Sequence, residues 1–179
     1  MDNLDGRREP AASLEEKIRD LAARMSRRAD EGGLGTGEIA ELRRWRHGGE
    51  ISPTAWRLLA LYANTESMRA ESEDRWLAVL AGMAHLSPHP HHAGANPGRV
   101  LAASDFSENR FHKLLNSRGA AFLEAVDRTC RFLRAQGASV DWTRFAPFIL
   151  TLDPDKAEQQ RRMLARDYFS QPVERKPEP

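Results

Sequence analysis

Residues 119–137 read GAAFLEAVDRTCRFLRAQG, and this stretch decides the fold class of the chain. Its large apolar side chains include Phe122, Val126 and Leu133, whose separations of four and seven residues place them on one face of an α-helix. Gly137 then supplies the residue type that most often follows the end of a helix. The stretch therefore predicts an amphipathic helix that turns its apolar face toward a core.

The same helical period recurs on both sides of this stretch. Ser13 followed by Glu16 has the pattern of a capping box, and Pro53 and Pro154 fit the first position of a helix, which tolerates proline. No stretch alternates apolar and polar residues with turn dipeptides between them, so β-strands are not expected. The sequence predicts an all-α fold. Helix starts are predicted at or next to Ser13, Thr36, Ser52, Ser72, Arg99, Ser107, Asp141 and Asp153.

Large aromatic side chains are expected to pack in the core rather than to stack on nucleic-acid bases, because they accompany apolar neighbours at helical spacing. These residues are Trp56, Trp76, Phe111, Phe122 and Phe132. In the third predicted helix the inner face is expected to hold Trp56 together with Leu59, Ala60 and Ala63. Trp45 stands beside three arginines and two glycines, so it is the aromatic residue with the strongest claim to a ligand contact.

Residues 87–98 are dense in proline, glycine and histidine, which no regular element tolerates. We expect this loop to separate an N-terminal helical lobe at 12–86 from a C-terminal helical bundle at 99–169. The polar, proline-containing tails at 1–11 and 170–179 lack helical periodicity and are expected to be disordered. The prediction is therefore two small helical bundles packed together.

The sequence lacks the segments that mark several classes of protein. The N-terminus shows no charged and then apolar signal pattern, and no stretch has the roughly 18 uninterrupted apolar residues that a membrane-spanning helix needs. The chain is therefore expected to be soluble and cytoplasmic. Its one cysteine, Cys130, cannot form an internal disulfide and lies in an apolar periodic segment, so a small buried thiol is expected.

One cluster in the sequence resembles a metal site: His89, His91 and His92, with His85 upstream. A zinc site generally needs about four ligands on rigid elements, and no cysteine or carboxylate stands nearby, so a solvated, mobile loop without a metal is expected. The chain also lacks a nucleophile elbow, a phosphate-cradling Gly-Lys-Ser loop and a His-Glu-x-x-His helix. We therefore expect neither an enzyme nor a cofactor.

Charge is unevenly distributed although the net charge is only +1. Residues 99–136 carry seven basic and four acidic side chains, and residues 42–63 carry four basic and one acidic. Of the 27 basic residues 23 are arginine, whose planar fork suits phosphate oxygens. A GC-rich genome would also raise the share of arginine. The two basic segments favour a polyanion as the partner.

Several basic side chains share the outer faces of adjoining helices. Arg128 and Arg131 are three residues apart on the helix of 119–137, away from its apolar face, and Arg110 and Lys113 stand on the helix before it. For any single arginine a solvated position is equally expected, but several together favour sequence-independent contacts with phosphates. The candidate nucleic-acid-binding residues are Arg43, Arg44, Arg99, Arg110, Lys113, Arg118, Arg128, Arg131 and Arg134.

A series of short motifs runs in order along residues 37–169. They are LRR at 42–44, PTAWRL at 53–58, GRVLA at 98–102, ENRFHKLL at 108–115, RFL at 131–133, VDW at 140–142 and RDYF at 166–169. In this order and spacing the chain resembles the CasB family, the small subunit of the type I-E CRISPR surveillance complex called Cascade. Met163 and Leu164 depart from the pattern, because many members would have an aromatic residue there. The histidine-rich loop belongs to this chain alone and receives no role from the family.

The resemblance implies an all-helical, non-catalytic subunit, present in two copies beside a large subunit and a backbone subunit. It also implies binding along the guide RNA and the target DNA, with the displaced strand held on a basic groove, while base pairing reads the sequence. An alternative is a helical protein-interaction subunit that docks on partner proteins without touching nucleic acid. A helix-turn-helix regulator is a third hypothesis, but no helix carries a convincing set of base-reading side chains.

Overall fold

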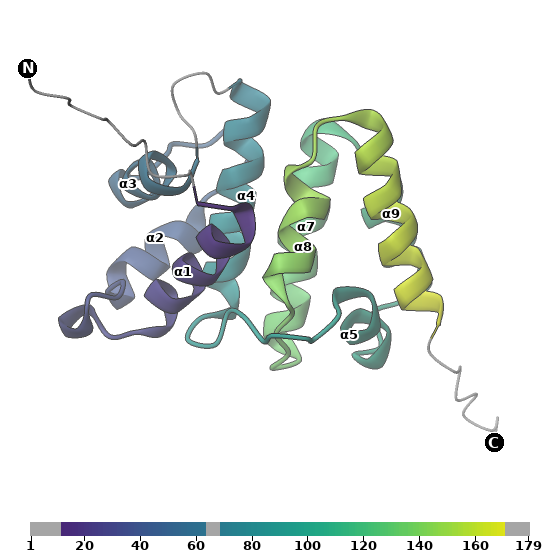
Figure 1. Ribbon diagram of the computed structural model, residues 1–179, viewed down its shortest axis with the longest axis horizontal. Coiled ribbons are helices and arrows are strands. Elements are labelled where there is room, and N and C mark those ends of the chain that lie inside the picture. The colour runs from purple at the N-terminus through teal and green to yellow at the C-terminus, as the bar shows by residue number, and fades with distance from the viewer. Residues whose placement is uncertain (1–11, 64–68, 171–179) are drawn as a thin grey trace, which may run out of the picture.

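The computed structural model describes residues 12–63 and 69–170, and within them all regular structure is helical (Figure 1). The prediction of an all-α fold is confirmed. The predicted tails at 1–11 and 170–179 lie outside the described residues, apart from Ser170, which closes the last helix. The helices are α1 (Leu14–Ser26), the short 3-10 helix η1 (Ala29–Glu31), α2 (Thr36–Arg44), α3 (Pro53–Tyr62), α4 (Ala70–Leu86), α5 (Pro97–Ala103), α6 (Glu108–Asn116), α7 (Gly119–Ala135), α8 (Trp142–Leu150) and α9 (Pro154–Phe169).

Side-chain caps begin α1, α3, α8 and α9 where the sequence predicts helix starts, whereas α4 and α7 begin without one and Ser107 makes no capping hydrogen bond at α6. At α1 the hydroxyl of Ser13 accepts from the amide of Glu16, and the Glu16 carboxylate accepts from the amide of Ser13 at 2.7 Å. Asp141 and Asp153 cap α8 and α9 in the same manner. Helix α2 differs, because Thr36 is its first residue rather than its cap. Each cap satisfies amides that have no partner within the helix.

Helix α4 stands in the middle of the molecule, with α1, α2 and α3 on one side and α7 and α8 on the other (Figure 1). Every residue from Trp76 to Leu86 is buried. Gly82 allows the close approach, because a Cβ atom there would lie 2.6 Å from the ring of Trp142 and 2.9 Å from the sulfur of Cys130. A side chain at this position would force α4 away from α7 and α8.

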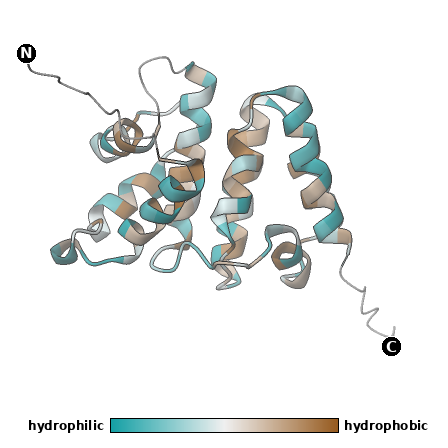
Figure 2. Cartoon of the chain, in the orientation of Figure 1, coloured by the Kyte–Doolittle hydropathy of each residue, from teal (hydrophilic) through white to brown (hydrophobic). Residues whose placement is uncertain are grey.

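The buried apolar side chains form one cluster, which extends from Ile18 in α1 to Tyr168 in α9. Figure 2 shows the matching pattern, with apolar residues in the middle of the molecule, where α7 and α8 overlap in this view, and mostly polar residues along α9. The core therefore continues on both sides of the link between α4 and α5. The division into separate bundles at 12–86 and 99–169 stays a prediction.

The observed loop is 87–96, because α5 begins at Pro97. This loop is fastened to the start of α8, so the prediction of a solvated loop is wrong for His91. The side chain of His91 is 15% exposed, and its Nδ1 accepts from the amide of Trp142 at 3.1 Å. The Asp141 carboxylate accepts from the amide of Gly94 at 2.9 Å. Burial lowers the pKa of His91 although the charge of Asp141 acts in the opposite direction. His91 thus serves as a structural acceptor.

The expected inner face of α3 is wrong at Trp56 and Ala60, which are exposed. The buried positions of α3 include Ala55, Leu58, Leu59 and Tyr62. The expectation failed because α3 is apolar on two faces, and helical spacing alone does not tell which face meets the core. Of the other aromatics expected in the core, Trp76, Phe111 and Phe122 are buried and Phe132 is partly buried.

Candidate nucleic-acid interface

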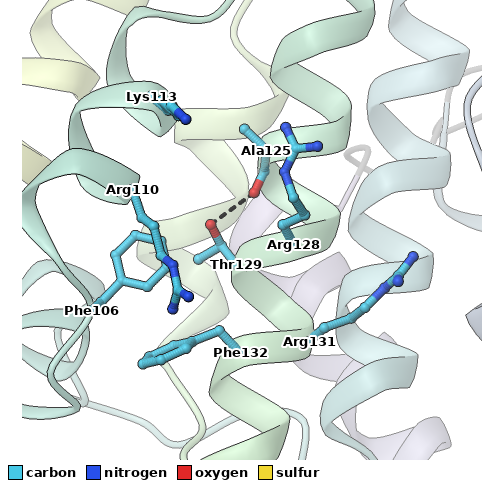
Figure 3. Close-up of a pocket in the computed structure, with 8 residues that line it drawn as sticks. All are labelled: Phe106, Arg110, Lys113, Ala125, Arg128, Thr129, Arg131 and Phe132. Atoms are coloured by element: carbon cyan, nitrogen blue, oxygen red, sulfur yellow. Dashed lines mark hydrogen bonds between the residues drawn. The ribbon is translucent and has the colours of Figure 1, made fainter.

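A cavity of about 640 Å³ opens between α6 and α7, and we call it the α6–α7 cavity (Figure 3). Four of the nine candidate residues meet there: Arg110 and Lys113 from α6, and Arg128 and Arg131 from α7. The full lining consists of Phe106, Arg110, Lys113, Ala125, Arg128, Thr129, Arg131 and Phe132.

The helical period explains why these cations converge. Arg110 and Lys113 are three residues apart on the exposed side of α6, and the adjacent side buries Phe111 and Leu114 in the core. Helix α7 has the same organisation, with Arg128 and Arg131 outward and residues such as Val126 and Leu133 inward. Because α6 and α7 pack side by side, their outward faces meet at one hollow.

Aromatic rings line the cavity beneath the cations. Phe106 is buried, and its ring meets the ring of Phe132 edge-on, with centroids 5.0 Å apart. The guanidinium carbon of Arg110 lies 5.6 Å from the centroid of Phe132, so the cation covers the ring face. The cavity therefore combines an apolar floor with a charged rim.

The two helices differ in how their cations are balanced. On α7, Arg128 pairs with Glu124 at 3.3 Å and Arg131 pairs with Asp127 at 2.5 Å. On α6, neither Arg110 nor Lys113 has a carboxylate within 4.0 Å among the described residues. The α6 cations are thus the ones available to an incoming anion without competition.

Asp127 joins three elements behind the cavity. Its carboxylate lies 3.0 Å from Nε2 of His85 on α4 and 3.6 Å from the guanidinium of Arg46, besides its pair with Arg131. Burial alone would raise the pKa of Asp127, but the hydrogen bond with His85 and the charges of Arg46 and Arg131 outweigh it and lower that pKa. Asp127 therefore stays ionised and orients Arg131.

A second hollow of about 330 Å³ lies on the other side of α7, and we call it the α2–α7 hollow. It is lined by Trp45, Arg46, His47, Leu123, Glu124, Asp127, Arg128 and Arg131. Arg128 and Arg131 therefore stand on the ridge between the two hollows. Trp45, the aromatic with the strongest claim to a ligand contact, lines this hollow but is buried. Basic side chains thus continue from α6 across α7 to the end of α2.

Two candidate residues are engaged with backbone carbonyls. Arg43 donates from Nε to the carbonyl of Ala84 at 2.7 Å and from Nη2 to that of Ser87 at 3.0 Å. Burial, and then the nearby charge of Arg134, lowers the pKa of Arg43. Arg118 donates to two carbonyls at the end of α6. Both side chains therefore complete the ends of helices.

The remaining candidates, Arg44, Arg99 and Arg134, are exposed and do not line the α6–α7 cavity. Sequence reasoning, in turn, did not select Phe106 or Thr129 as site residues. No sequence signal marks Phe106, because it stands in the link before α6, after Asp105 with its positive φ of 58°.

The family model described as CRISPR-associated protein Cse2 matches residues 38–169. This chain belongs to the Cse2 family. The resemblance to the CasB family seen in the sequence motifs is therefore confirmed.

Solved structures share the fold of this Cse2 family member. Two chains from Thermus thermophilus, one described as a Cse2-family CRISPR-associated protein and one as CasB, each match with 19% identity and a TM-score of 0.70, over 89% of this chain and 100% of theirs. A chain in E. coli Cascade bound to a PAM-containing double-stranded DNA target matches with 18% identity and a TM-score of 0.58, over 84% of this chain and 93% of that chain. The comparison with curated proteins finds no match.

Two further properties of residues 12–63 and 69–170 bear on other kinds of site. No helix there has the length and apolar character to cross a membrane. No group of three or more His, Cys, Asp or Glu side chains in those ranges is arranged to hold a metal ion.

Proposed function

We propose that this chain is a non-catalytic subunit of a type I-E CRISPR Cascade complex that holds nucleic acid by its sugar-phosphate backbone. The observation that carries the proposal is the convergence of Arg110, Lys113, Arg128 and Arg131 on one open cavity. Membership of the Cse2 family, and the fold shared with a chain of DNA-bound E. coli Cascade, support the assembly.

The chemistry of the cavity favours phosphate contacts over base reading. Arginine and lysine bind phosphate oxygens without regard to sequence, and base pairing with a guide leaves the protein to stabilise the opened strands. The proposed ligands are therefore the guide RNA, the target DNA and the displaced strand. The proposed protein neighbours are the large subunit, the backbone subunit and a second copy of this chain. A net charge of only +1 fits a subunit that docks on proteins as well.

Binding of a labelled oligonucleotide to the full chain, followed by fluorescence anisotropy at increasing salt, tests the proposal. We expect affinity to fall steeply with salt, because cations that neutralise phosphates release counterions. Replacing Arg110, Lys113, Arg128 and Arg131 jointly by glutamine should lower the slope of log affinity against log salt by roughly three to four units, about one per lost phosphate contact. Helical content should be unchanged, because all four side chains are exposed.

A matched control removes the same number of charges elsewhere. Arg19, Arg28, Arg57 and Arg162 are exposed arginines outside the lining of the α6–α7 cavity. Their joint replacement by glutamine should leave the salt dependence largely intact. If both variants lost affinity equally, the cavity would have no special role, and if binding were indifferent to salt, the proposed function would be wrong.

The same cavity variant, assembled into reconstituted Cascade with its guide RNA, tests the function in the complex. We expect slower opening of a target duplex, measured by the fluorescence of a base analogue in the displaced strand, with complex assembly unchanged. Normal opening in a complex that contains the variant would contradict the role in strand stabilisation.

A second candidate function, protein docking, is favoured by exposed apolar side chains on α3 and α9. These two helices lie on opposite sides of the molecule (Figure 1). Trp56 and Leu61 are exposed on α3, and Met163 and Phe169 are exposed on α9. A partner protein could cover such exposed apolar side chains. Crosslinking within assembled Cascade separates the two functions: crosslinks from α6 and α7 to protein alone would favour docking without nucleic acid.

A further inference from the structure

We propose that the α6–α7 cavity receives one unstacked base of a single strand, while the cations around it hold the neighbouring phosphates. This inference rests on the proposed function and adds to it the form of nucleic acid that the site takes. It makes the site selective for single strands over duplexes.

The cavity has the volume for a base. Its volume of about 640 Å³ lies in the range of roughly 300–1,000 Å³ found for pockets that enclose small organic molecules. A flat patch of arginines would suffice for a phosphate backbone, which binds by charge alone. The hollow between α6 and α7 thus offers room that backbone binding does not require.

The floor of the cavity presents a guanidinium group above an aromatic ring to a planar ligand. The Arg110 guanidinium lies over the ring of Phe132, and Phe106 supports that ring from its edge. Bases stack on aromatic rings and on guanidinium planes alike, so a base could stack on Arg110 above Phe132. Figure 3 shows the Arg110 and Phe132 side chains directed into the same hollow, with Lys113 above them.

The rim provides charge of one sign only. Among the described residues the lining includes four cations and no carboxylate, whereas the α2–α7 hollow is lined by both Glu124 and Asp127. The hydroxyl of Thr129 already donates to the carbonyl of Ala125 at 2.8 Å, so its proton is not available to a ligand in the cavity. A ligand that unites a flat apolar body with flanking negative charges satisfies floor and rim together, and a nucleotide within a strand has that chemistry.

Charge density distinguishes the two forms of nucleic acid. Duplex DNA carries about one negative charge per 1.7 Å of axis, more than a single strand, so purely electrostatic binding favours the duplex. Bases in a duplex are paired and stacked and do not enter a cavity without unpairing. Preference for the single strand therefore requires contacts with a base.

The test compares three labelled oligonucleotides of equal length on the full chain: oligothymidine, the same strand with abasic sites throughout, and a duplex. We expect the abasic strand to bind at least about fivefold more weakly than oligothymidine, because stacking of one base on an aromatic platform contributes at least that factor to the affinity. We expect the duplex to bind no more tightly than oligothymidine. An oligonucleotide with 2-aminopurine should lose fluorescence on binding as its base stacks.

Two variants locate the effect. Phe132→Leu removes the ring, and Arg110→Lys keeps the charge but removes the plane, so each should bring the affinity for oligothymidine close to that for the abasic strand. Phe169→Leu, which changes an exposed aromatic residue outside the cavity lining, is the control and should preserve the difference. Because Arg110 is exposed, its variant tests the idea even where Phe132→Leu fails to fold.

Three outcomes are distinguishable. Tighter binding of oligothymidine than of the abasic strand, lost in both cavity variants, supports the base-receiving cavity. Equal, salt-dependent binding of the two strands overturns the cavity as a base site and leaves backbone binding intact. Absence of salt-dependent binding to any of the three overturns the proposed function and the inference with it.

Discussion

Around α4, arginine side chains hydrogen bond to carbonyls at the ends of helices, whereas in the α6–α7 cavity they face an open hollow. Arg43 reaches the carbonyls at the C-terminal end of α4, and Arg75, near its other end, reaches those at the end of α8. Arg46 and Arg118 close α2 and α6 in the same way. The last carbonyls of a helix lack partners within it and carry partial negative charge, so a guanidinium suits them.

The difference teaches that the number of arginines in a segment does not by itself identify a polyanion surface. The helix ends of a bundle are themselves binding sites for guanidinium groups. Two of the four cavity cations, Arg110 and Lys113, differ from these arginines because they have neither a carbonyl nor a carboxylate within hydrogen-bonding distance among the described residues, and they share one open cavity with Arg128 and Arg131.

The largest effect is expected from Arg75→Met, which keeps the aliphatic stem and removes the charge. Arg75 donates to the carbonyls of Ile149 at 2.7 Å and Thr151 at 3.1 Å, and it lies over the ring of Phe122. The variant should lower the free energy of unfolding by about 3 kcal/mol, because part-buried carbonyls lose charged donors. Urea denaturation followed by far-UV circular dichroism measures the change. Unaltered stability would contradict the assignment of Arg75 as an arginine that stabilises the fold.

Next in size is Arg43→Met, which should lower the free energy of unfolding by about 2 kcal/mol while leaving the affinity for oligonucleotides unchanged. Its two hydrogen bonds tie α2 to the end of α4. The neighbouring exposed Arg44 provides the control, because Arg44→Met should alter stability by less than about 0.5 kcal/mol. A large loss of DNA binding by Arg43→Met would mean that Arg43 contacts nucleic acid as the cavity residues are proposed to do.

Asp127 connects the two regions, and its lowered pKa gives a dependence on pH. A carboxyl whose pKa is lower in the folded chain contributes stability above its ordinary pKa of 3.8, and this contribution is lost as the pH falls through the folded pKa. Asp127→Asn should therefore cost about 1 kcal/mol near neutral pH and progressively less below pH 3.8. Urea denaturation of both proteins across this range measures the difference, and a constant gap would contradict the ionised role.

The smallest effect is expected from Glu124→Gln, which releases Arg128 at the ridge of the cavity. An exposed pair on one helix contributes only about 0.3–0.5 kcal/mol, so affinity for an oligonucleotide should rise about twofold. Glu15 and Arg19 on α1 form a pair of the same spacing and similar exposure, so Glu15→Gln is the matched control and should leave the affinity unchanged. Anisotropy titration at low salt measures both. A decrease on Glu124→Gln would mean that the carboxylate positions Arg128 for binding.

Helices and their caps could be predicted from the sequence because they depend on neighbours within a few residues. The capping box of Ser13 and the aspartates before α8 and α9 are cases of this kind. The burial of His91 and the exposure of Trp56 depend on segments distant in the chain, and no local period records them.

The candidate site could be predicted in part for the same reason. Spacing of three residues on α6 and α7 identified the four cations that line the cavity. No local pattern indicated that Arg43 would meet carbonyls 41 and 44 positions away, or that Phe106 would complete the floor. Such contacts arise only when helices pack.

The contact between Gly82 on α4 and Cys130 on α7 allows the separation of these two helices to be measured through the reactivity of the thiol. Cys130 is the one thiol in the sequence, and its sulfur lies against α4, fully shielded from solvent. Burial also raises the pKa of the thiol, so reactive thiolate is scarce. An alkylating reagent reaches it only when α4 and α7 separate. The rate of alkylation therefore measures how often α4 and α7 separate, and no label has to be introduced.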